Sequence, residues 1–471
     1  MRPIRRLALL QLVLPAALGA QSPVPAPVRA IDWPAIEREG VTLLREYLRV
    51  NSTNPPGNEL TAATFLRDFL AKEGIEAQIL DTTELGTGRA NLYARVKGNG
   101  SKRAIALVHH MDVVPATAST WTAPPFSGEL RDGYVYGRGA LDMKGEGIAQ
   151  LMAVVALKRG GVPLTRDLVI IANADEELGS TGALTFADKH ADLLRDVEFL
   201  FTEGGSNSVR NDTLRFRGVG VSEKRTFWQR LTVRGIPSHG SRPTKHNPVP
   251  RLVAALDRLA RHETPLHVTP GVDRFFRDIS RDYPGERGRW LQNVTEALKD
   301  PRAREWILSD VYWNAILRNT ISLTGLQGSN KTNVIPPEAS ADVDVRLLPD
   351  QDPDSVLATL KAVVADTAVT FTPLIVPKPP FESPTATDFF RAVERVSQER
   401  DPKAFVTSSM LPAATDRPMY RRLGIHVYGL DPFRTNDVEF QRGVHGNDER
   451  ISVVNFLAGV RFLYDVLRYV Q

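Results

Sequence analysis

Hydrophobic and polar residues follow two alternating patterns over the first half of the chain. Short apolar runs with few polar interruptions predict buried strands at 75–80, 90–96, 104–108, 167–172 and 197–201. Apolar residues at helical spacing predict helices at about 33–48, 59–73 and 147–159. Strands that alternate with helices indicate an α/β sheet, in which chemistry is expected in the loops at the strand ends.

The pattern changes after Lys224. Apolar and polar residues alternate over 227–233, which predicts a half-exposed antiparallel strand. Further elements are predicted as a helix at about 249–261, helical stretches within 265–320, and strands around 319–326 and 339–347. Beyond Asp354 the helix–strand alternation resumes. We therefore predict a catalytic domain in two parts, 32–223 and 348–471, with an inserted α+β domain at 224–347.

The N-terminal segment has a different character. Residues 1–20 read MRPIRRLALLQLVLPAALGA, and a basic start, a short apolar stretch and small residues before Ala20 are typical of a signal peptide. The apolar stretch is short and broken by Pro15, so it does not predict a stable membrane anchor. A Pro-rich spacer follows at 21–31. We expect export to a periplasmic or extracellular location after cleavage near Ala20; the alternative is an uncleaved amphipathic leader.

Composition narrows the class of protein. The 471 residues are enough for two domains, and 42% hydrophobic and 24% charged residues are ordinary for a globular protein. The net charge is +4, but the basic residues are scattered without a basic and aromatic run, so nucleic-acid binding is not expected. The chain has no cysteine, which excludes disulfides, thiolate metal sites and a cysteine nucleophile.

The first chemical signal stands where the strand at 104–108 ends, in His109-His110-Met111-Asp112. Side chains two apart on an extended segment share a face, so His110 and Asp112 should point the same way. This suits a metal-binding imidazole with a carboxylate behind it that fixes its tautomer. About thirty residues later, Asp142 stands in a Gly-rich bend before a helix. A single motif of this kind is more often incidental.

More acids and a histidine follow at successive loops. Glu176 and Glu177 come after one predicted strand, Glu203 after the next, and His445 just before the last helix. Adjacent carboxylates do not easily face one direction, so one can bind a metal while the other reaches a metal-activated water. Singly, these residues could be solvated loop acids, a helix cap and a surface histidine. Together with Asp142 they form a converging set of carboxylates, which would repel one another unless two divalent ions supplied positive charge.

In combination and in order, these segments resemble the dizinc aminoacylase/carboxypeptidase metallopeptidase family, which includes glutamate carboxypeptidase, aminoacylase and carnosinase. The resemblance covers about 35–465 and rests on HMDVVP, GRGALDMKG, DEELGS, TEGG, GIPSHGSRP, NVIP, DVDVR, ATDRP and HGNDERI. The stretch WTAPPFSGELRDGYVYGRGALDMKG is most similar to the carboxypeptidase S and N-acyl-amino-acid hydrolase branch. The family implies a zinc-peptidase-like α/β catalytic domain with an inserted α+β lid, or dimerisation, domain. Pro418 departs from the family's ATDxR pattern.

The resemblance implies two Zn²⁺ ions, with Co²⁺ or Mn²⁺ as alternatives. It assigns the metal ligands to His110, Asp142, Glu177, Glu203 and His445. In this assignment Asp142 bridges the two ions, His110 and Glu203 hold one, and Glu177 and His445 hold the other. The family also has a cis peptide bond after the bridging aspartate, so we expect one between Asp142 and Met143.

The same resemblance implies the remaining roles at the site. Asp112 would orient the metal-binding histidine, and Glu176 would be the general base that moves a proton from a metal-activated water to the leaving amine. His239 would stabilise the oxyanion, in dimeric relatives from the partner subunit. Asn333 and Arg346 would hold the terminal carboxylate of the substrate.

The expected function is an exported dizinc metallohydrolase. It would cleave the amide bond of dipeptides, C-terminal peptide residues or N-acyl amino acids that carry a free carboxylate, as a homodimer through the lid. A dizinc aminopeptidase would share the metal cluster but lack the lid residues His239 and Arg346. A non-catalytic peptide-binding relative would have lost a ligand or Glu176. A biosynthetic deacetylase or desuccinylase is disfavoured, because those reactions are cytoplasmic and this chain carries an export signal.

Overall fold

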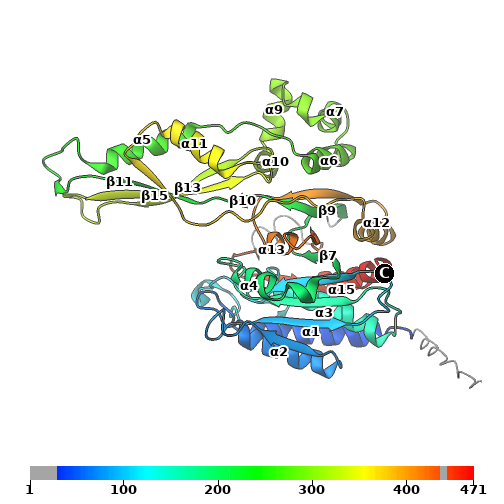
Figure 1. The fold of residues 1–471 in the computed structure, drawn as a ribbon. Coiled ribbons are helices and arrows are strands. Elements are labelled where there is room, and N and C mark those ends of the chain that lie inside the picture. Colours follow the sequence, from blue (N-terminus) through cyan, green and yellow to red (C-terminus); the bar gives the residue numbers. More distant parts are fainter. Residues whose placement is uncertain (1–28, 212, 435–442) are drawn as a thin grey trace, which may run out of the picture.

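The computed structural model describes residues 29–211, 213–434 and 443–471, which form a layered catalytic domain and an elongated lid above it (Figure 1). The predicted signal peptide at 1–20 and all but the last residues of the spacer at 21–31 lie outside the described residues. Within the described part of the chain, none of the helices is long and apolar enough to cross a membrane.

A sheet of nine described strands forms the centre of the catalytic domain. In spatial order its strands are β1 (Ala77–Leu80), β2 (Asn91–Val96), β6 (Leu168–Asn173), β3 (Ala104–His110), β7 (Val197–Thr202), β18 (His426–Gly429), β9 (Thr213–Glu223) and β17 (Phe405–Leu411), and β8 (Ser206–Arg210) pairs with β9. β3 runs parallel to both β6 and β7. The carboxyl ends of these three strands therefore meet at one edge, where the sequence places the histidine and acidic motifs.

Helices cover both faces of this sheet. Three of them lie at the predicted positions 33–48, 59–73 and 147–159, whereas the helix at 181–189 was not predicted. The helices are α1 (Trp33–Arg49), α2 (Glu59–Lys72), α3 (Lys144–Arg159), α4 (Thr181–Lys189), α12 (Asp388–Arg400), α13 (Arg417–Arg421) and α15 (Val453–Tyr469), with 3₁₀ turns at Ala118–Thr120 and Ala191–Leu194. A small sheet pairs β5 (Tyr134–Tyr136) with β4 (Glu129–Arg131) and with β19 (Arg450–Ser452). This sheet brings the HGNDERI segment beside the segment that contains Asp142.

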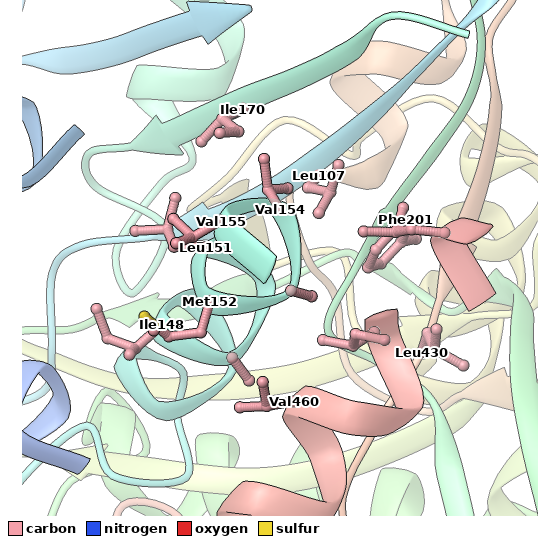
Figure 2. Packing of buried hydrophobic residues seen from close by; sticks show 14 of the residues in the cluster. Leu107, Ile148, Leu151, Met152, Val154, Val155, Ile170, Phe201, Leu430 and Val460 are labelled. Atoms are coloured by element: carbon pink, nitrogen blue, oxygen red, sulfur yellow. The ribbon is translucent and has the colours of Figure 1, made fainter. Parts of the chain in front are cut away.

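α3 is buried along nearly its whole length because α1 and α15 cover the side that faces away from the sheet. Figure 2 shows Leu151 and Val155 of α3 near Ile170 of the sheet, and Val460 of α15 on another side of the helix. The helix also approaches β3 closely. A Cβ atom at Gly147 would lie 2.5 Å from the ring of His109, so glycine is required at this crossing. This tight packing fixes the start of α3 and so helps to position the loop that precedes it.

The lid contains a separate antiparallel sheet with its own core. Its strands are β10 (Arg225–Thr226), β11 (Gln229–Arg234), β13 (Thr320–Gln327), β15 (Glu338–Leu347) and β16 (Val369–Pro373). α5 (Pro248–Arg261) and α11 (Pro353–Val364) pack against one another over this sheet. A short pairing between β12 (Ser238–His239) and β14 (Val334–Ile335) joins two loops at the free end of the lid.

The predicted end of the inserted domain at 347 is wrong. β16 pairs with β11 along the lid sheet, with Val369 opposite Val233, so the lid extends to Pro373. From the sequence, the helix and strand after 347 are predicted to continue the α/β pattern of the catalytic domain. A helix followed by a strand has the same local pattern whichever sheet the strand joins, so the sequence could not place this boundary.

Part of the predicted inserted domain packs elsewhere. The segment between α5 and β13 forms α6 (Pro270–Ile279), a 3₁₀ turn (Ser280–Asp282), α7 (Glu286–Gln292), α8 (Val294–Ala297), α9 (Pro301–Leu308) and α10 (Val311–Ile316). Phe275 of α6 packs edge-on against Phe216 of β9, with 5.9 Å between ring centroids. Phe216 in turn contacts Phe405 of β17. These helices therefore cover the far edge of the catalytic sheet, which corrects their predicted assignment to the lid.

Candidate metal centre

Asp142 lies between two histidines that are far apart in the sequence. Its Oδ1 is 3.1 Å from Nε2 of His110, at the end of β3, and its Oδ2 is 3.2 Å from Nε2 of His445, in the loop before β19. The peptide bond between Asp142 and Met143 is cis, as expected. Each carboxylate oxygen of Asp142 thus faces a different imidazole, which is the arrangement that a bridging ligand requires.

A glutamate accompanies each histidine. Oε1 of Glu203, after β7, lies 3.8 Å from Nε2 of His110, and Oε2 of Glu177, after β6, lies 3.1 Å from Nε2 of His445. His110 is buried, whereas the His445 side chain is 54% exposed. The cluster therefore combines a buried histidine with an exposed one, and it brings together all five residues that the sequence predicts as ligands.

Asp112 connects His110 to the turn that carries the two adjacent glutamates. Nδ1 of His110 lies 2.9 Å from the carbonyl oxygen of Asp112 and 3.6 Å from its Oδ1. The carboxylate of Asp112 accepts hydrogen bonds from the backbone N–H groups of Glu176 and Glu177, at 3.1 and 3.2 Å, and from the side chain of Asn54 at 2.8 Å. Asp112 therefore fixes both the imidazole and the turn opposite it.

Glu449 fixes the loop that presents Asp142. Its Oε1 accepts hydrogen bonds from the backbone N–H groups of Leu141 and Asp142, at 2.7 and 3.1 Å. Its Oε2 accepts from the N–H of Gly139 at 3.0 Å and from Nη1 of Arg138 at 2.7 Å. Glu449 is fully buried, so these bonds replace its hydration. Apart from the position of Glu449 in HGNDERI, no sequence pattern indicates this role.

The electrostatics of the cluster favour positive charge among its carboxylates. Burial raises the pKa of Glu203 well above its ordinary value, and the charge of Asp142 raises it further. Hydrogen bonds to Asp142 and Glu177 raise the pKa of His445 to about 10. Burial opposes protonation of His110, but its carboxylate neighbours still hold the pKa well above the usual value. Without metal, protons on the two histidines thus partly balance the carboxylates.

The donor set fits two divalent ions. Ligand atoms lie within 4.8 Å of one another in the group His110, Asp142 and Glu177 and in the group His110, Glu176 and Glu203. Oε1 of Glu177 is buried and has no hydrogen-bond partner among the described residues, so it is free to bind a cation. Imidazole and carboxylate ligands suit zinc as well as Mn²⁺ or Co²⁺. The second group also places the Glu176 carboxylate at the metal pair.

Lid residues predicted to contact the substrate lie apart from this cluster. His239 is exposed, and the hydrogen bonds of its side chain among the described residues stay within its own loop, at Ser241. Asn333 is exposed beside it, where its carbonyl accepts from the N–H of Gly240. Arg346 in β15 pairs with Asp344 through two hydrogen bonds, at 2.8 and 3.2 Å. The structure therefore joins His239 and Asn333 at the free end of the lid but does not join them to the metal cluster.

Comparison with known proteins decides the family. A profile of the Peptidase family M20/M25/M40 matches residues 106–469. The chain belongs to this family. Human N-fatty-acyl-amino acid synthase/hydrolase PM20D1 is 30% identical to this M20 protein over 387 residues, which cover 80% of this chain and 76% of the human protein. Human aminoacylase-1 is 27% identical over 436 residues, which cover 91% and 94% of the two chains.

Solved structures show the same fold. The M20 family metallo-carboxypeptidase Sso-CP2 from Sulfolobus solfataricus aligns with a TM-score of 0.72 at 19% identity, over 92% of this chain and 99% of that chain. Human carnosine dipeptidase 1 aligns with a TM-score of 0.66 at 17% identity, over 93% and 98%. The predicted α/β fold and the predicted family are confirmed. This M20 protein is a metal-dependent hydrolase of the metallopeptidase and amidohydrolase class.

Proposed function

We propose that this protein is an exported dizinc hydrolase that cleaves dipeptides, C-terminal peptide residues or N-acyl amino acids with a free carboxylate, with Glu176 as its general base. One observation carries the proposal. Glu176 is attached through its backbone N–H to Asp112, and its carboxylate lies with His110 and Glu203 at the metal cluster while the neighbouring Glu177 contacts His445. The two adjacent glutamates thus have different positions that suit different roles.

The proposed metal assignment follows the contacts. His110 and Glu203 would hold one ion and His445 and Glu177 the other, while Asp142 contributes one oxygen to each. When bound, the two ions would make a water acidic enough to attack near neutral pH and would polarise the scissile carbonyl. Zinc is the preferred metal on chemical grounds, with Co²⁺ and Mn²⁺ as alternatives.

Glu176 would hold and move the proton. Burial raises the pKa of its carboxyl well above the usual value, although the charge of His110 opposes the rise. A base with raised proton affinity can accept a proton from water near neutral pH and then deliver it to the leaving amine. Asp112 would keep this carboxylate in place, because it binds the backbone of Glu176 and also orients His110.

Substrate contacts would come from the lid. Arg346 has a planar guanidinium group that suits a bidentate contact to the carboxylate of the substrate, which would replace Asp344 as its partner. His239 would stabilise the oxyanion, and Asn333, its neighbour in the lid, would help to hold the substrate carboxylate. Since these two residues lie away from the cluster of their own chain, we propose that they reach the site of a second copy.

Features of the lid surface support such a homodimer. Apolar side chains are exposed at Ile236 (58%), Val253 (56%) and Leu326 (71%). Among the described strands, β13 pairs with β15 alone, which leaves one of its edges available to another strand. Sedimentation of the pure protein tests the dimer, and a Leu326→Asp variant should then be monomeric.

The decisive experiment is an activity panel. The zinc-loaded protein is incubated with dipeptides, N-acyl amino acids and the amidated form of each, and Glu176→Gln serves as the control. We expect cleavage of free-carboxylate substrates and a loss of about a hundredfold or more in the variant. A Glu176→Gln variant as active as the parent would exclude the proposed base. Export is tested separately by the mass of the protein recovered outside the cytoplasm, which should begin at Gln21.

A further inference from the structure

A lysine in the segment that returns from the lid reaches the turn that carries Glu176. Lys378 lies between β16 and α12, and its side chain is half-buried. Its Nζ donates to Oγ of Ser180 at 2.5 Å and to the carbonyl oxygen of Thr415 at 2.9 Å. Ser180 closes the turn that contains Glu176, and Thr415 precedes the buried Asp416. One ammonium group therefore joins two loops that border the metal cluster.

The same ammonium group faces buried carboxyl groups that are not metal ligands. Burial raises the pKa of Glu176, of Asp416 and of Glu223, and the positive charge of Lys378 opposes the rise at all three. Glu223 has a further cation, because Arg417 lies 3.1 Å from its Oε2. At Glu176 the charge of His110 lowers the pKa more than that of Lys378 does, whereas at Asp416 the charge of Lys378 has the larger effect of the two. Ser180 also lies near Asp416, and its side chain lowers the pKa of that carboxyl group.

The backbone of Lys378 is attached to the start of the lid. Arg225 in β10 donates from Nε to the carbonyl oxygen of Lys378 at 2.8 Å and from Nη1 to that of Gln351 at 3.0 Å. The chain leaves the catalytic domain from β9 to β10 and returns from β16 to α12, so Arg225 ties the two crossings together. A continuous series of contacts thus runs from the base of the lid through Lys378 to the turn of Glu176.

We propose that Lys378 is a positioning residue for Glu176. Lys378 holds the turn that carries Glu176 against the loop that contains Asp416, and it links the position of this turn to the point where the lid joins the catalytic domain. This inference rests on the proposed role of Glu176 as general base. Lys378 acts on the reaction through Ser180 and through its charge, and it contributes no ligand to the metal cluster. Its loss should therefore impair turnover more than substrate binding.

The test compares variants of the full zinc-loaded chain on a substrate that the parent hydrolyses. Lys378→Met should lower kcat about tenfold or more, because a charge-assisted hydrogen bond is lost, while KM stays within about twofold and zinc content is unchanged. Lys378→Arg should recover most of the rate. Ser180→Gly removes the hydroxyl without backbone strain, since Ser180 has a φ of 57°, and should reproduce part of the defect. Lys299→Met, at an exposed lysine of the helical segment, is the control.

A double-mutant cycle tests whether Lys378 affects the rate through its contact with Ser180 or independently of that contact. If Lys378 acts through Ser180, the Lys378→Met/Ser180→Gly double variant should be about as slow as Lys378→Met alone, because both changes remove one contact. The proposal is overturned by a parental kcat in Lys378→Met, by fully multiplicative effects, or by a rate loss that merely follows lost zinc. If Lys378→Met does not fold, parental rates in Ser180→Gly overturn it. An inactive parent would instead refute the proposed function, and an active Glu176→Gln variant would refute the general base.

Discussion

The backbone N–H of Asp142 donates to Oε1 of Glu449 at 3.1 Å, across 307 positions of sequence. The residue that faces both histidines of the cluster is therefore held by a carboxylate from the other end of the chain. The same carboxylate binds Arg138 and two further backbone N–H groups. The geometry of the metal centre thus depends on the docking of the C-terminal segment onto the first half of the catalytic domain.

Replacing Glu449 with glutamine should destabilise the protein and weaken metal binding. The amide keeps the shape of the side chain but loses the charge, which leaves Arg138 as an uncompensated buried cation. The amide NH₂ group, a donor, would also face backbone N–H groups in place of an accepting oxygen. Breaking a buried pair of this kind costs about 3 kcal/mol of unfolding free energy. Denaturant unfolding and zinc titration measure both effects. Glu296→Gln removes an exposed pair with Lys299 and should cost less than about 1 kcal/mol; equal losses in the two variants would contradict the role of Glu449.

Metal binding should release protons. The pKa of His445 is raised to about 10, so we expect this imidazole to carry a proton at pH 7 in the metal-free protein, and the pKa of His110 is raised as well. A metal must displace these protons, and the apparent zinc affinity should therefore fall as the pH is lowered below these pKa values. Calorimetry at pH 7 in buffers of different ionisation enthalpy should show a net release of about one proton or more.

Histidine variants test which side chains release these protons. His445→Ala should release about one proton fewer than the parent and should bind one ion more weakly. His426→Ala, a histidine of β18 outside the cluster, should leave the proton count unchanged. A zinc affinity that is independent of pH between 6 and 9 would show that the two imidazoles are not ligands.

Arg346→Ala should raise KM for free-carboxylate substrates by about tenfold or more, because one charge-assisted bidentate contact is lost. The amidated analogues should show little change between parent and variant. Arg230→Ala is a matched control, since Arg230 lies in the same sheet and pairs with Asp342 as Arg346 pairs with Asp344. If both arginine variants affect the two substrate forms alike, the carboxylate contact lies elsewhere.

The sequence predicts the parts of this site that local patterns encode. His110, Glu177 and Glu203 stand at or shortly after the ends of strands whose apolar runs are easy to recognise, and parallel strands bring their ends together. Their motifs also carry the family resemblance, which the comparison confirms. Asp142 and His445 were found for the same reason, although the bend and the loop that hold them have no periodic pattern.

Other features depend on contacts that no local pattern reveals. Glu449 binds a backbone N–H group 307 positions earlier in the sequence, and Lys378 binds Ser180, which lies 198 positions earlier. The sequence does not locate the end of the lid, because the local pattern of β16 is the same whether this strand pairs with β11 or with a strand of the catalytic sheet. The helices between α5 and β13 have amphipathic patterns, which predict that one face of each helix is buried. These patterns do not predict whether that face packs on the lid or on the catalytic sheet.

The central claim is that His110, Asp142, Glu177, Glu203 and His445 hold two ions in one pocket. Anomalous diffraction at the zinc edge from crystals of the zinc-loaded protein tests it most directly. We predict two peaks about 3.5–4 Å apart, one beside His110 and Glu203 and one beside His445 and Glu177, with Asp142 between them. A single peak, or zinc bound away from these five side chains, would contradict the account.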